Sequence, residues 1–262
     1  MDTHLHSDIS FDSDAPMAQM VQACLDAGVR EMCFTEHMDY GNPDTDDFIS
    51  DLTRYRRVYE QTCRRFPGVS IGYGLELGYY PAAFKAAQAH IAGERFDHVI
   101  LSAHAVDGVD PYFGGYFQGK DRRTAYGAYL AVVDEMLGAD FDGFTSVGHI
   151  TYVAKYAPFR PQPCAYREFP ALFDHILTQI IRQDKALEIN TSSLAVYGAP
   201  SPGWDVAARY RQLGGRLICL GSDAHQPDRA GLGFRRTQTA LRQIGFTELF
   251  TFKNMQPVPH KL

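Results

Sequence analysis

Residues 216–225 read RLICLGSDAH, an apolar run that ends in a glycine and is followed by an aspartate and a histidine. The run 216–221 has the length and the apolar content of a buried strand. Asp223 and His225 then stand just past the end of that strand. In parallel barrels, functional side chains gather at the carboxyl ends of the strands. The stretch therefore predicts a strand that delivers two polar side chains to a functional face.

The same arrangement recurs along the chain. Six further short apolar segments are typical of strands, at 2–6, 31–35, 70–77, 98–102, 143–148 and 186–190. Apolar residues at helical spacing lie between several of them, at 17–25, 48–59, 126–137 and 169–180. Gly28 and Gly138 stand where two of these helices would end. Strands that alternate with helices predict an α/β fold with a parallel sheet, which right-handed crossovers can close into a barrel.

The length and composition predict one soluble domain that covers residues 1–262. Hydrophobic residues make up 45% of the chain and charged residues 21%, which is ordinary for a globular protein. We expect no membrane span, because no apolar run reaches 18 residues, and no signal peptide, because the N-terminus lacks a basic stretch followed by an apolar one. The five cysteines occur singly, which favours free thiols and a cytoplasmic location.

The net charge of −6 argues against an extended nucleic-acid partner, since no basic tract is longer than two residues. A small anionic substrate remains compatible with this charge. In that case, metal ions or a few placed cations would supply the positive charge.

Histidine and carboxylate side chains fall at six of the seven predicted strands. They are His4 and His6 on the first, His37 after the second, Glu76 at the end of the third, His104 after the fourth, His149 after the fifth, and Asp223 and His225 after the seventh. His4 and His6 alternate, so both project to the same side of their strand. Asp12 is a further donor, with Asp8 and Asp14 as alternatives, and Asp14 is also a candidate cap of the first helix. We expect the remaining histidines to be surface or packing residues: His90, His98, His175 and His260.

Imidazole and carboxylate ligands without cysteine suit zinc, manganese or iron rather than a structural zinc knot. Nine donors are too many for one ion and suit two or three divalent transition-metal ions that share a bridging carboxylate. Such a cluster can bind a phosphate, acidify a water molecule and stabilise a leaving alkoxide. The sequence therefore predicts a polynuclear metal site whose chemistry suits a phosphate group.

Seven segments in this order resemble the polymerase and histidinol phosphatase (PHP) superfamily: HLHSDISFD (4–12), FTEH (34–37), LELG (75–78), SAH (102–104), GHITY (148–152), EINTS (188–192) and GSDAH (221–225). The resemblance covers nearly the whole chain and is best to the stand-alone histidinol-phosphate phosphatase branch. It implies a distorted seven-stranded (β/α)7 TIM-like barrel. It also implies a metal-dependent phosphomonoesterase of histidine biosynthesis that converts L-histidinol phosphate to L-histidinol through a metal-bridging hydroxide.

The resemblance further implies three ions. The first would take His4, His6, Glu76 and Asp223, the second Glu76, His104 and His149, and the third Asp12, His37 and His225. The match favours Asp12 over Asp8 or Asp14. We assign a catalytic role to Glu76, Asp223 and His225.

The chain departs from the family pattern at three positions. Glu36 and Thr151 replace residues that usually stand next to ligands, where we expect them to adjust the ligands. Ala195 occupies the place of an arginine that grips the phosphate in many relatives. We therefore predict Arg160, or else Lys155, as the replacement cation. Asn190 is a further candidate substrate-binding residue.

The segment 106–123 is rich in glycine and aromatic residues and is long for a connection. We expect it either to cover the substrate with Tyr112, Phe113, Tyr116 or Phe117, or to pack on the barrel. Alternative functions are a PHP phosphoesterase for another phosphomonoester or for a nucleotide phosphodiester. An amide-hydrolysing metal barrel is disfavoured because no lysine lies in the strand before His104, and a non-catalytic barrel is disfavoured because all nine ligands are present.

Overall fold

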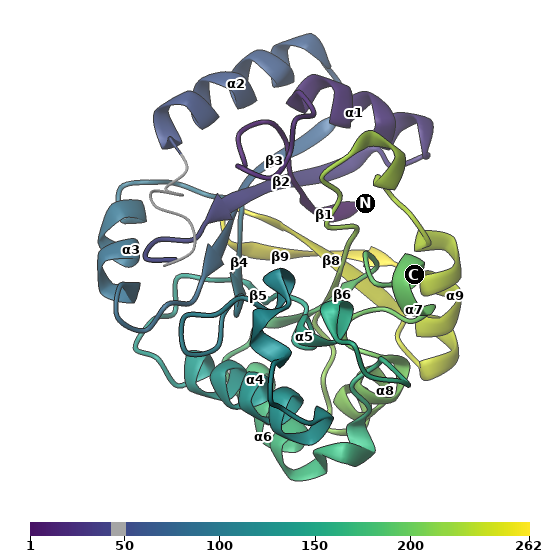
Figure 1. Cartoon of the computed structure of the whole chain (residues 1–262). Coiled ribbons are helices and arrows are strands. Elements are labelled where there is room, and N and C mark those ends of the chain that lie inside the picture. The colour runs from purple at the N-terminus through teal and green to yellow at the C-terminus, as the bar shows by residue number, and fades with distance from the viewer. Residues whose placement is uncertain (43–50) are drawn as a thin grey trace.

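A computed structural model describes residues 1–42 and 51–262 of the chain. Seven parallel strands form one sheet in which the spatial order follows the chain order (Figure 1). The strands are β1 (Asp2–Leu5), β2 (Glu31–Met38), β3 (Ser70–Gly78), β4 (His98–Ser102), β5 (Ser146–Val147), β6 (Ala186–Asn190) and β7 (Ile218–Gly221). The α/β fold and its seven predicted strands are confirmed.

The sheet curls until its first and last strands meet. The His4 carbonyl accepts a hydrogen bond from the Asp223 amide at 2.8 Å, and the His6 amide donates to the Ala224 carbonyl at 3.1 Å. These bonds run between β1 and the residues just after β7, so the barrel is nearly closed. The β5 strand has only two paired residues, where the sequence predicted six at 143–148, and this short strand distorts the barrel.

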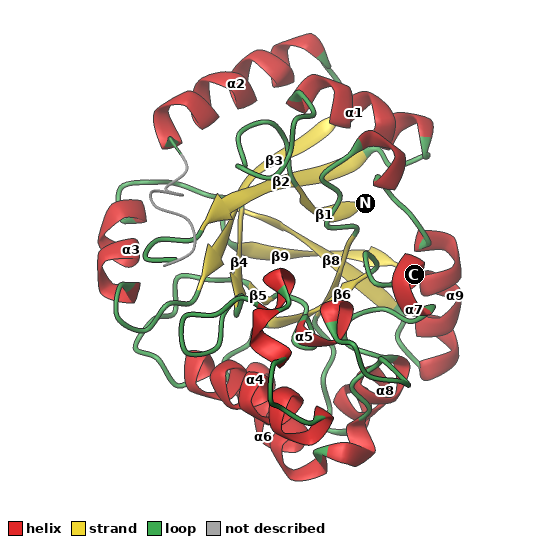
Figure 2. Cartoon of the chain, viewed as in Figure 1, coloured by secondary structure: helices red, strands yellow, loops and turns green. Residues whose placement is uncertain are grey.

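Helices cover the outside of the barrel (Figure 2). They are α1 (Met17–Asp26), α2 (Leu52–Arg65), α3 (Phe84–Ile91), α4 (Arg122–Leu137), α5 (Val153–Tyr156), α6 (Pro170–Arg182), α7 (Leu194–Tyr197), α8 (Trp204–Gln212) and α9 (Phe234–Ile244). The four predicted amphipathic stretches correspond to α1, α2, α4 and α6, although Phe48 lies outside the described residues. Gly28 follows α1 with φ +81°, a backbone conformation that glycine adopts at little cost. Gly138 caps α4.

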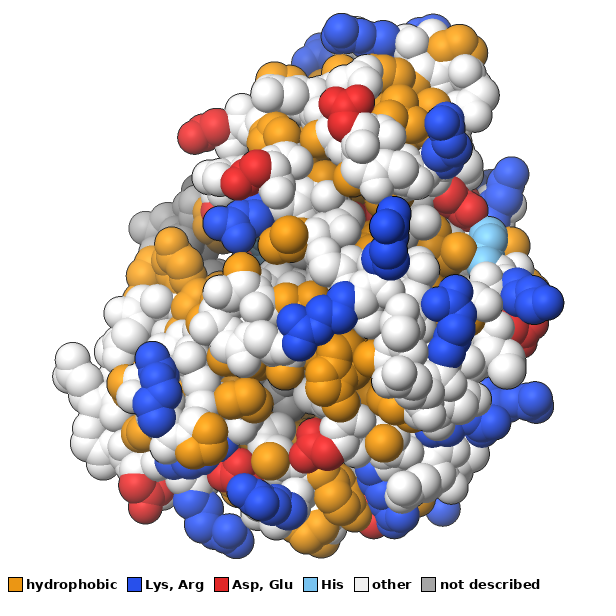
Figure 3. Space-filling view, turned by 90° about the vertical axis from the view of Figure 1, so that its right-hand side faces the viewer, with side chains coloured by type: hydrophobic (Ala, Val, Ile, Leu, Met, Phe, Trp, Pro, Cys, Tyr) orange, Lys and Arg blue, Asp and Glu red, His pale blue; other side chains and the backbone are white. Residues whose placement is uncertain are grey.

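The helices pack their apolar faces against strands that are buried on both sides. On α6, for example, Phe173, Ile176 and Ile180 are fully buried. Replacing such a residue as Phe173 with alanine costs about 3–5 kcal/mol of stability. On the side of the molecule shown in Figure 3, Lys and Arg side chains are spread over the surface among apolar and uncharged groups. Within the described part of the chain, no helix is long and apolar enough to cross a membrane.

An antiparallel hairpin covers the amino ends of the strands, opposite the predicted site. It consists of β8 (Glu248–Lys253) and β9 (Gln256–Lys261) and was not predicted from the sequence. The Phe252 ring stacks on His98, at the start of β4, with 4.4 Å between ring centroids. The His98 ring is fully buried, and its Nδ1 lies 2.6 Å from Thr145 Oγ1. His98 is therefore a packing residue, as the sequence predicted.

Candidate metal centre

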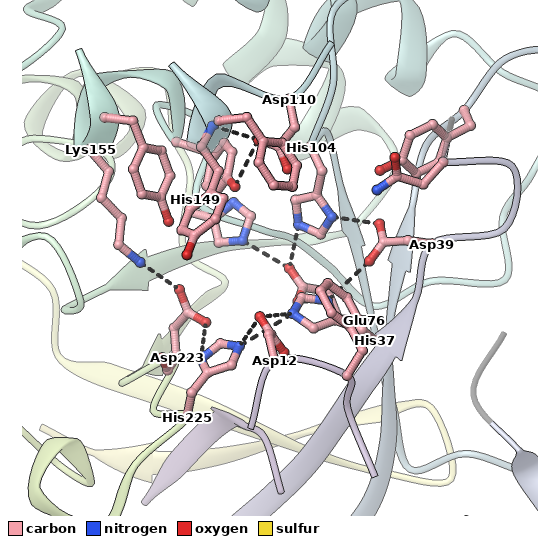
Figure 4. A pocket seen from close by; sticks show the side chains of 17 residues that line it. Asp12, His37, Asp39, Glu76, His104, Asp110, His149, Lys155, Asp223 and His225 are labelled. Atoms are coloured by element: carbon pink, nitrogen blue, oxygen red, sulfur yellow. Dashed lines mark hydrogen bonds and ion pairs between the residues drawn. The ribbon is translucent and has the colours of Figure 1, made fainter. Parts of the chain in front are cut away.

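The predicted metal ligands lie together at the carboxyl ends of the strands. His4 projects from β1, His37 from β2 and Glu76 from β3, and His6 directly follows the last residue of β1. The other predicted ligands belong to the loops that follow β1, β4, β5 and β7: Asp12, His104, His149, Asp223 and His225. His37 thus lies within β2, which extends to Met38, rather than after it as predicted. Figure 4 shows the side chains of His37, Glu76, His104, His149 and Asp223 around one cavity.

Glu76 is at the centre of this group and is fully buried. Its Oε1 lies 3.1 Å from His104 Nε2 and 2.8 Å from His149 Nε2. Its Oε2 lies 3.1 Å from both His4 Nε2 and His37 Nδ1. The two carboxylate oxygens therefore face different histidine groups, as a carboxylate that bridges two cations would.

Asp223 also presents its two oxygens to different neighbours. Its Oδ1 lies 3.5 Å from His6 Nε2 and 3.7 Å from His4 Nε2. Its Oδ2 lies 3.5 Å from Lys155 Nζ and accepts a hydrogen bond from Ser192 Oγ at 3.2 Å. One side of this carboxylate thus belongs to the histidine cluster and the other to the open cavity.

Asp12 joins the third group of ligands. Its Oδ2 lies 3.0 Å from His225 Nε2 and 3.5 Å from His37 Nε2. The alternatives form no ion pair with the cluster in the described part of the chain: Asp8 pairs with Arg54 at 3.5 Å, and Asp14 is exposed and pairs with none of its histidines. Asp14 does not cap α1 either, because Pro16 is the N-cap residue and no side chain bonds there. The geometry favours Asp12, as the family resemblance implied.

The protonation of the His4 and His6 imidazoles follows from the side chains that bond to their Nδ1 atoms. His4 Nδ1 lies 2.5 Å from Glu188 Oε1, and a carboxylate only accepts, so this nitrogen carries the proton. The Ser10 hydroxyl donates its single hydrogen to Glu36 at 2.5 Å and therefore accepts from His6 Nδ1 at 3.1 Å. In the neutral imidazole form that binds metal, both rings would therefore present a lone pair on Nε2, and these two Nε2 atoms lie 3.0 Å apart. A cation beside both nitrogens could be coordinated by them.

Two further histidines repeat this arrangement. His104 Nδ1 lies 2.7 Å from Asp39 Oδ1, and His225 Nδ1 lies 3.1 Å from the Asp223 carbonyl. In both rings Nε2 points inward, where it meets Glu76 or Asp12. Rings held through one nitrogen while the other faces a carboxylate are typical of metal ligands. Among the residues that the structure describes, four sets of three donor atoms lie within 4.8 Å of one another: His4–His6–Asp223, His4–Glu76–His149, His37–Glu76–His104 and His6–His37–His225. The donor set therefore fits divalent metal ions.

The electrostatics of the cluster also reflect its dense packing. Burial lowers the pKa of His4, but Glu188, Glu76 and Asp223 together raise it well above its usual value. Burial likewise lowers the pKa of His104, whereas Asp39 and Glu76 raise it, to about 10 overall. Protons and metal ions thus compete for these nitrogens, since ligand histidines must be neutral.

Sequence reasoning missed the two carboxylates that hold the outer nitrogens, Glu188 and Asp39. Glu188 lies on β6, the one strand for which no ligand was predicted, and its Oε2 also accepts from the His149 amide at 2.7 Å. A single carboxylate inside the apolar run 186–190 was the available signal. Asp39 follows His37 by two residues, the spacing that places two side chains on the same side of a strand.

Glu36 and Thr151, the two departures from the family pattern that stand next to predicted ligands, have different contacts. Glu36 reaches the predicted ligand His6 through the Ser10 hydroxyl. Thr151 instead bonds to Ser201, with 2.8 Å between the two hydroxyl oxygens.

Of the predicted substrate-binding residues, the structure brings only Lys155 to the cavity. Arg160 is exposed, does not line the cavity, and bonds through its guanidinium to the Phe159 carbonyl at 2.9 Å. Asn190 is fully buried behind the cluster, where its amide donates to Glu188 at 3.3 Å. The prediction of Arg160 and Asn190 as substrate contacts is therefore corrected: the first points to solvent and the second supports Glu188.

The loop 106–123 has two parts that lie in different surroundings. Tyr112 and Phe113, in the short 3-10 helix η1 (Pro111–Phe113), are exposed and line the cavity. Tyr116 and Phe117, in η2 (Gly115–Phe117), are buried in the core. The packing expectation is thus confirmed for Tyr116 and Phe117, whereas a substrate contact of Tyr112 or Phe113 stays a prediction.

Comparison with known proteins agrees with this geometry. A family model described as the PHP domain matches residues 2–192. The histidinol-phosphatase of Lactococcus lactis is 30% identical over 258 residues, which cover 98% of this chain and 95% of the relative. A probable histidinol-phosphatase of Deinococcus radiodurans is 30% identical over 269 residues, with 98% of each chain covered.

A solved structure leads to the same family. The crystal structure of the Lactococcus lactis histidinol phosphate phosphatase, complexed with zinc, L-histidinol and phosphate, aligns with a TM-score of 0.88 at 30% identity and covers 98% of both chains. The family model matches more than half of this chain, and the similarity to these relatives extends over nearly all of it. The chain belongs to the PHP domain family.

Proposed function

We propose that this protein is a metal-dependent phosphomonoesterase that hydrolyses L-histidinol phosphate to L-histidinol. The observation that carries the proposal is the cluster of inward-facing Nε2 atoms and carboxylates around Glu76, which opens into a cavity of about 380 Å³. That volume suits a small metabolite. The relatives named histidinol-phosphatase, which match along nearly their whole length, support this substrate.

The nine clustered residues would hold two or three divalent ions, for which zinc, manganese and iron are the candidates. We assign His4, His6, Glu76 and Asp223 to one ion, Glu76, His104 and His149 to a second, and Asp12, His37 and His225 to a third. Zinc is supported by the complex of the Lactococcus lactis relative. When bound, such ions would neutralise phosphate oxygens and lower the pKa of water for attack on phosphorus. Glu76, Asp223 and His225 would be the catalytic residues.

The chain's own contribution to phosphate binding would come from Lys155. It is the one lysine or arginine among the described residues that line the cavity, and its Nζ lies 3.5 Å from Asp223 Oδ2. Burial lowers the pKa of Lys155, but Asp223 and Tyr156 raise it overall, so the ammonium stays charged at neutral pH. A lysine beside a metal-ligating carboxylate can meet a phosphate oxygen as a point charge. It would thereby take over from the arginine that Ala195 replaces.

We further propose that residues 1–262 work as one domain. The family model ends at residue 192, but β7 completes the barrel and supplies Asp223 and His225. A cytoplasmic location is part of the same proposal, and the five free cysteines support it.

The test is a substrate screen with protein purified without chelators and reconstituted with zinc, manganese or iron. Phosphate release would be measured from L-histidinol phosphate, an aryl phosphate and a nucleoside monophosphate, together with hydrolysis of a nucleotide phosphodiester. We expect the highest kcat/KM with L-histidinol phosphate, loss of activity with chelator, and recovery on adding metal. A preference for the diester would support the alternative PHP activity, and no hydrolysis at full metal content would refute the proposal.

A further inference from the structure

Asp110 is a carboxylate in the wall of the cavity that none of the proposed metal sites uses. It lies in the loop after β4, directly before η1, and is 9% exposed. Its Oδ1 accepts hydrogen bonds from the Tyr112 amide at 2.8 Å and from the Tyr152 hydroxyl at 3.1 Å. Figure 4 shows it on the His104 side of the cavity, away from Asp12 and His225.

This carboxylate lacks a cationic partner in the part of the chain that is described. No Lys, Arg or His there lies within ion-pair distance of it, and both of its hydrogen bonds reach Oδ1 rather than Oδ2. Burial raises the pKa of Asp110, although the Tyr112 amide, the charge of the more distant His104 and the Tyr152 hydroxyl partly offset this. A buried carboxylate that is not paired by the protein costs free energy unless a ligand supplies the charge.

Aromatic rings connect Asp110 to the metal centre. The Tyr152 ring lies 5.2 Å from that of His149 and 5.5 Å from that of His104. Beyond it, the Tyr156 ring lies 5.0 Å from Tyr152 and 5.2 Å from Tyr112, in the loop that contains Asp110. Aromatic faces beside a carboxylate favour an organic cation, because the rings attract positive charge and the carboxylate pairs with it.

The two parts of the cavity thus have opposite preferences. The metal centre and Lys155 select a dianionic phosphate, while Asp110 and the tyrosines select a positive group close to it. We propose that Asp110 binds the amine of the substrate. The site would then select phosphate monoesters of amino alcohols over esters that are otherwise identical but lack the amine. This inference rests on the proposed function and adds the residue that recognises the organic part.

The test compares two esters that differ only in the amine: L-histidinol phosphate and 3-(imidazol-4-yl)propyl phosphate. The variant is Asp110→Asn, which keeps an oxygen that accepts from Tyr112 and Tyr152 but removes the charge. The matched control is Asp107→Asn, in the same loop. Asp107 is exposed and has φ +51°, which asparagine tolerates well, and the charge change is the same.

We expect the wild type to prefer the amine ester by at least about tenfold in kcat/KM. Asp110→Asn should lower kcat/KM for that ester by about ten- to a hundredfold and leave the amine-free ester within about threefold, whereas Asp107→Asn should change neither. Metal content and melting temperature are measured for each protein, so that a folding defect is recognised. Equal losses on both esters, or no loss on either, would overturn the proposal and leave Asp110 as a cap of η1.

A binding measurement separates this inference from the proposed function. Titration of the metal-loaded protein with L-histidinol alone requires no turnover. Weaker binding to Asp110→Asn than to the wild type and the Asp107→Asn control supports amine recognition even if the wild type hydrolyses neither ester. Equal affinity for all three proteins would refute it even if hydrolysis is efficient.

Discussion

Replacing Glu188 with glutamine should weaken metal binding although Glu188 is not a proposed ligand. Its Oε1 accepts from His4 Nδ1 at 2.5 Å and from the Asn190 amide at 3.3 Å, while its Oε2 accepts from the His149 amide at 2.7 Å. Glutamine has one oxygen and cannot satisfy both sides. If that oxygen turns to His149, the amide N–H₂ faces the proton on His4 Nδ1.

The conflict has two resolutions, and both cost free energy. Either His4 moves its proton to Nε2, where the lone pair is needed for the metal, or a buried donor loses its partner. An unsatisfied buried donor costs about 1–3 kcal/mol, which is about ten- to a hundredfold in the metal dissociation constant. Loss of the supporting group of a ligand histidine typically has an effect of the same size, about ten- to a hundredfold.

Competition with a chromogenic chelator measures this constant for wild type and Glu188→Gln. The matched control is Glu135→Gln. Glu135 also accepts a hydrogen bond from a ring substituent, the hydroxyl of the buried Tyr79, at 2.9 Å, but it lies on α4 away from the cluster. Glu135→Gln should bind metal as the wild type does. A wild-type affinity in Glu188→Gln would refute the argument that Glu188 fixes the tautomer of His4.

Three further predictions follow from the same structure. Glu76→Ala should lose more metal, measured by elemental analysis after dialysis, than His104→Ala does, because both oxygens of Glu76 face histidines; an equal loss would argue against a bridging role. Lys155→Met should lower kcat/KM on the best phosphomonoester by about ten- to a hundredfold at equal metal content, whereas the exposed control Lys85→Met should not; a change under about threefold would remove Lys155 from the phosphate site. Burial lowers the pKa of His98 to about 3, so the folded state stays neutral while the unfolded chain takes up a proton below pH 6.5. That contribution to stability is present above pH 6.5 and is lost as pH falls, by about 2 kcal/mol between pH 7 and 5; denaturant unfolding of His98→Gln should lack this loss, and parallel pH curves for the two proteins would contradict the assignment.

The ligand residues could be predicted from the sequence because topology makes their convergence unavoidable. Apart from Asp12, which only the family resemblance favoured, each predicted ligand lies in or directly after an apolar segment, and parallel strands in chain order bring their carboxyl ends to one face. His4 and Asp223 are the clearest case. They are far apart in sequence, yet the closure of β1 on the end of β7 joins the backbones of these two residues.

The supporting residues could not be predicted in this way, because their function depends on distances across the barrel. Glu188 reaches His4 only when β6 and β1 both flank β7 in the closed barrel. The prediction that Arg160 contacts the substrate failed because it relied on sequence distance alone. Proximity in sequence to His149 does not fix the direction in which a loop leaves the carboxyl ends of the strands. The β8–β9 hairpin was missed because two prolines, Pro257 and Pro259, and charged residues interrupt its apolar pattern.

Glu188 and Asp39, the carboxylates that bond to the Nδ1 atoms of His4 and His104, also explain how a barrel with a two-residue β5 can hold its predicted ligands in place. His4 on β1 is held by Glu188 on β6, and His104 after β4 is held by Asp39 after β2. Each hydrogen bond crosses between elements that are not adjacent in the sheet, so the ligands are fixed by the whole barrel rather than by their own strands. Since His4 belongs to β1 and Asp223 follows β7, the two ends of the closed barrel meet at the predicted centre, and metal binding and barrel closure would favour each other. The centre that carries the chemistry is thereby also a part of the core.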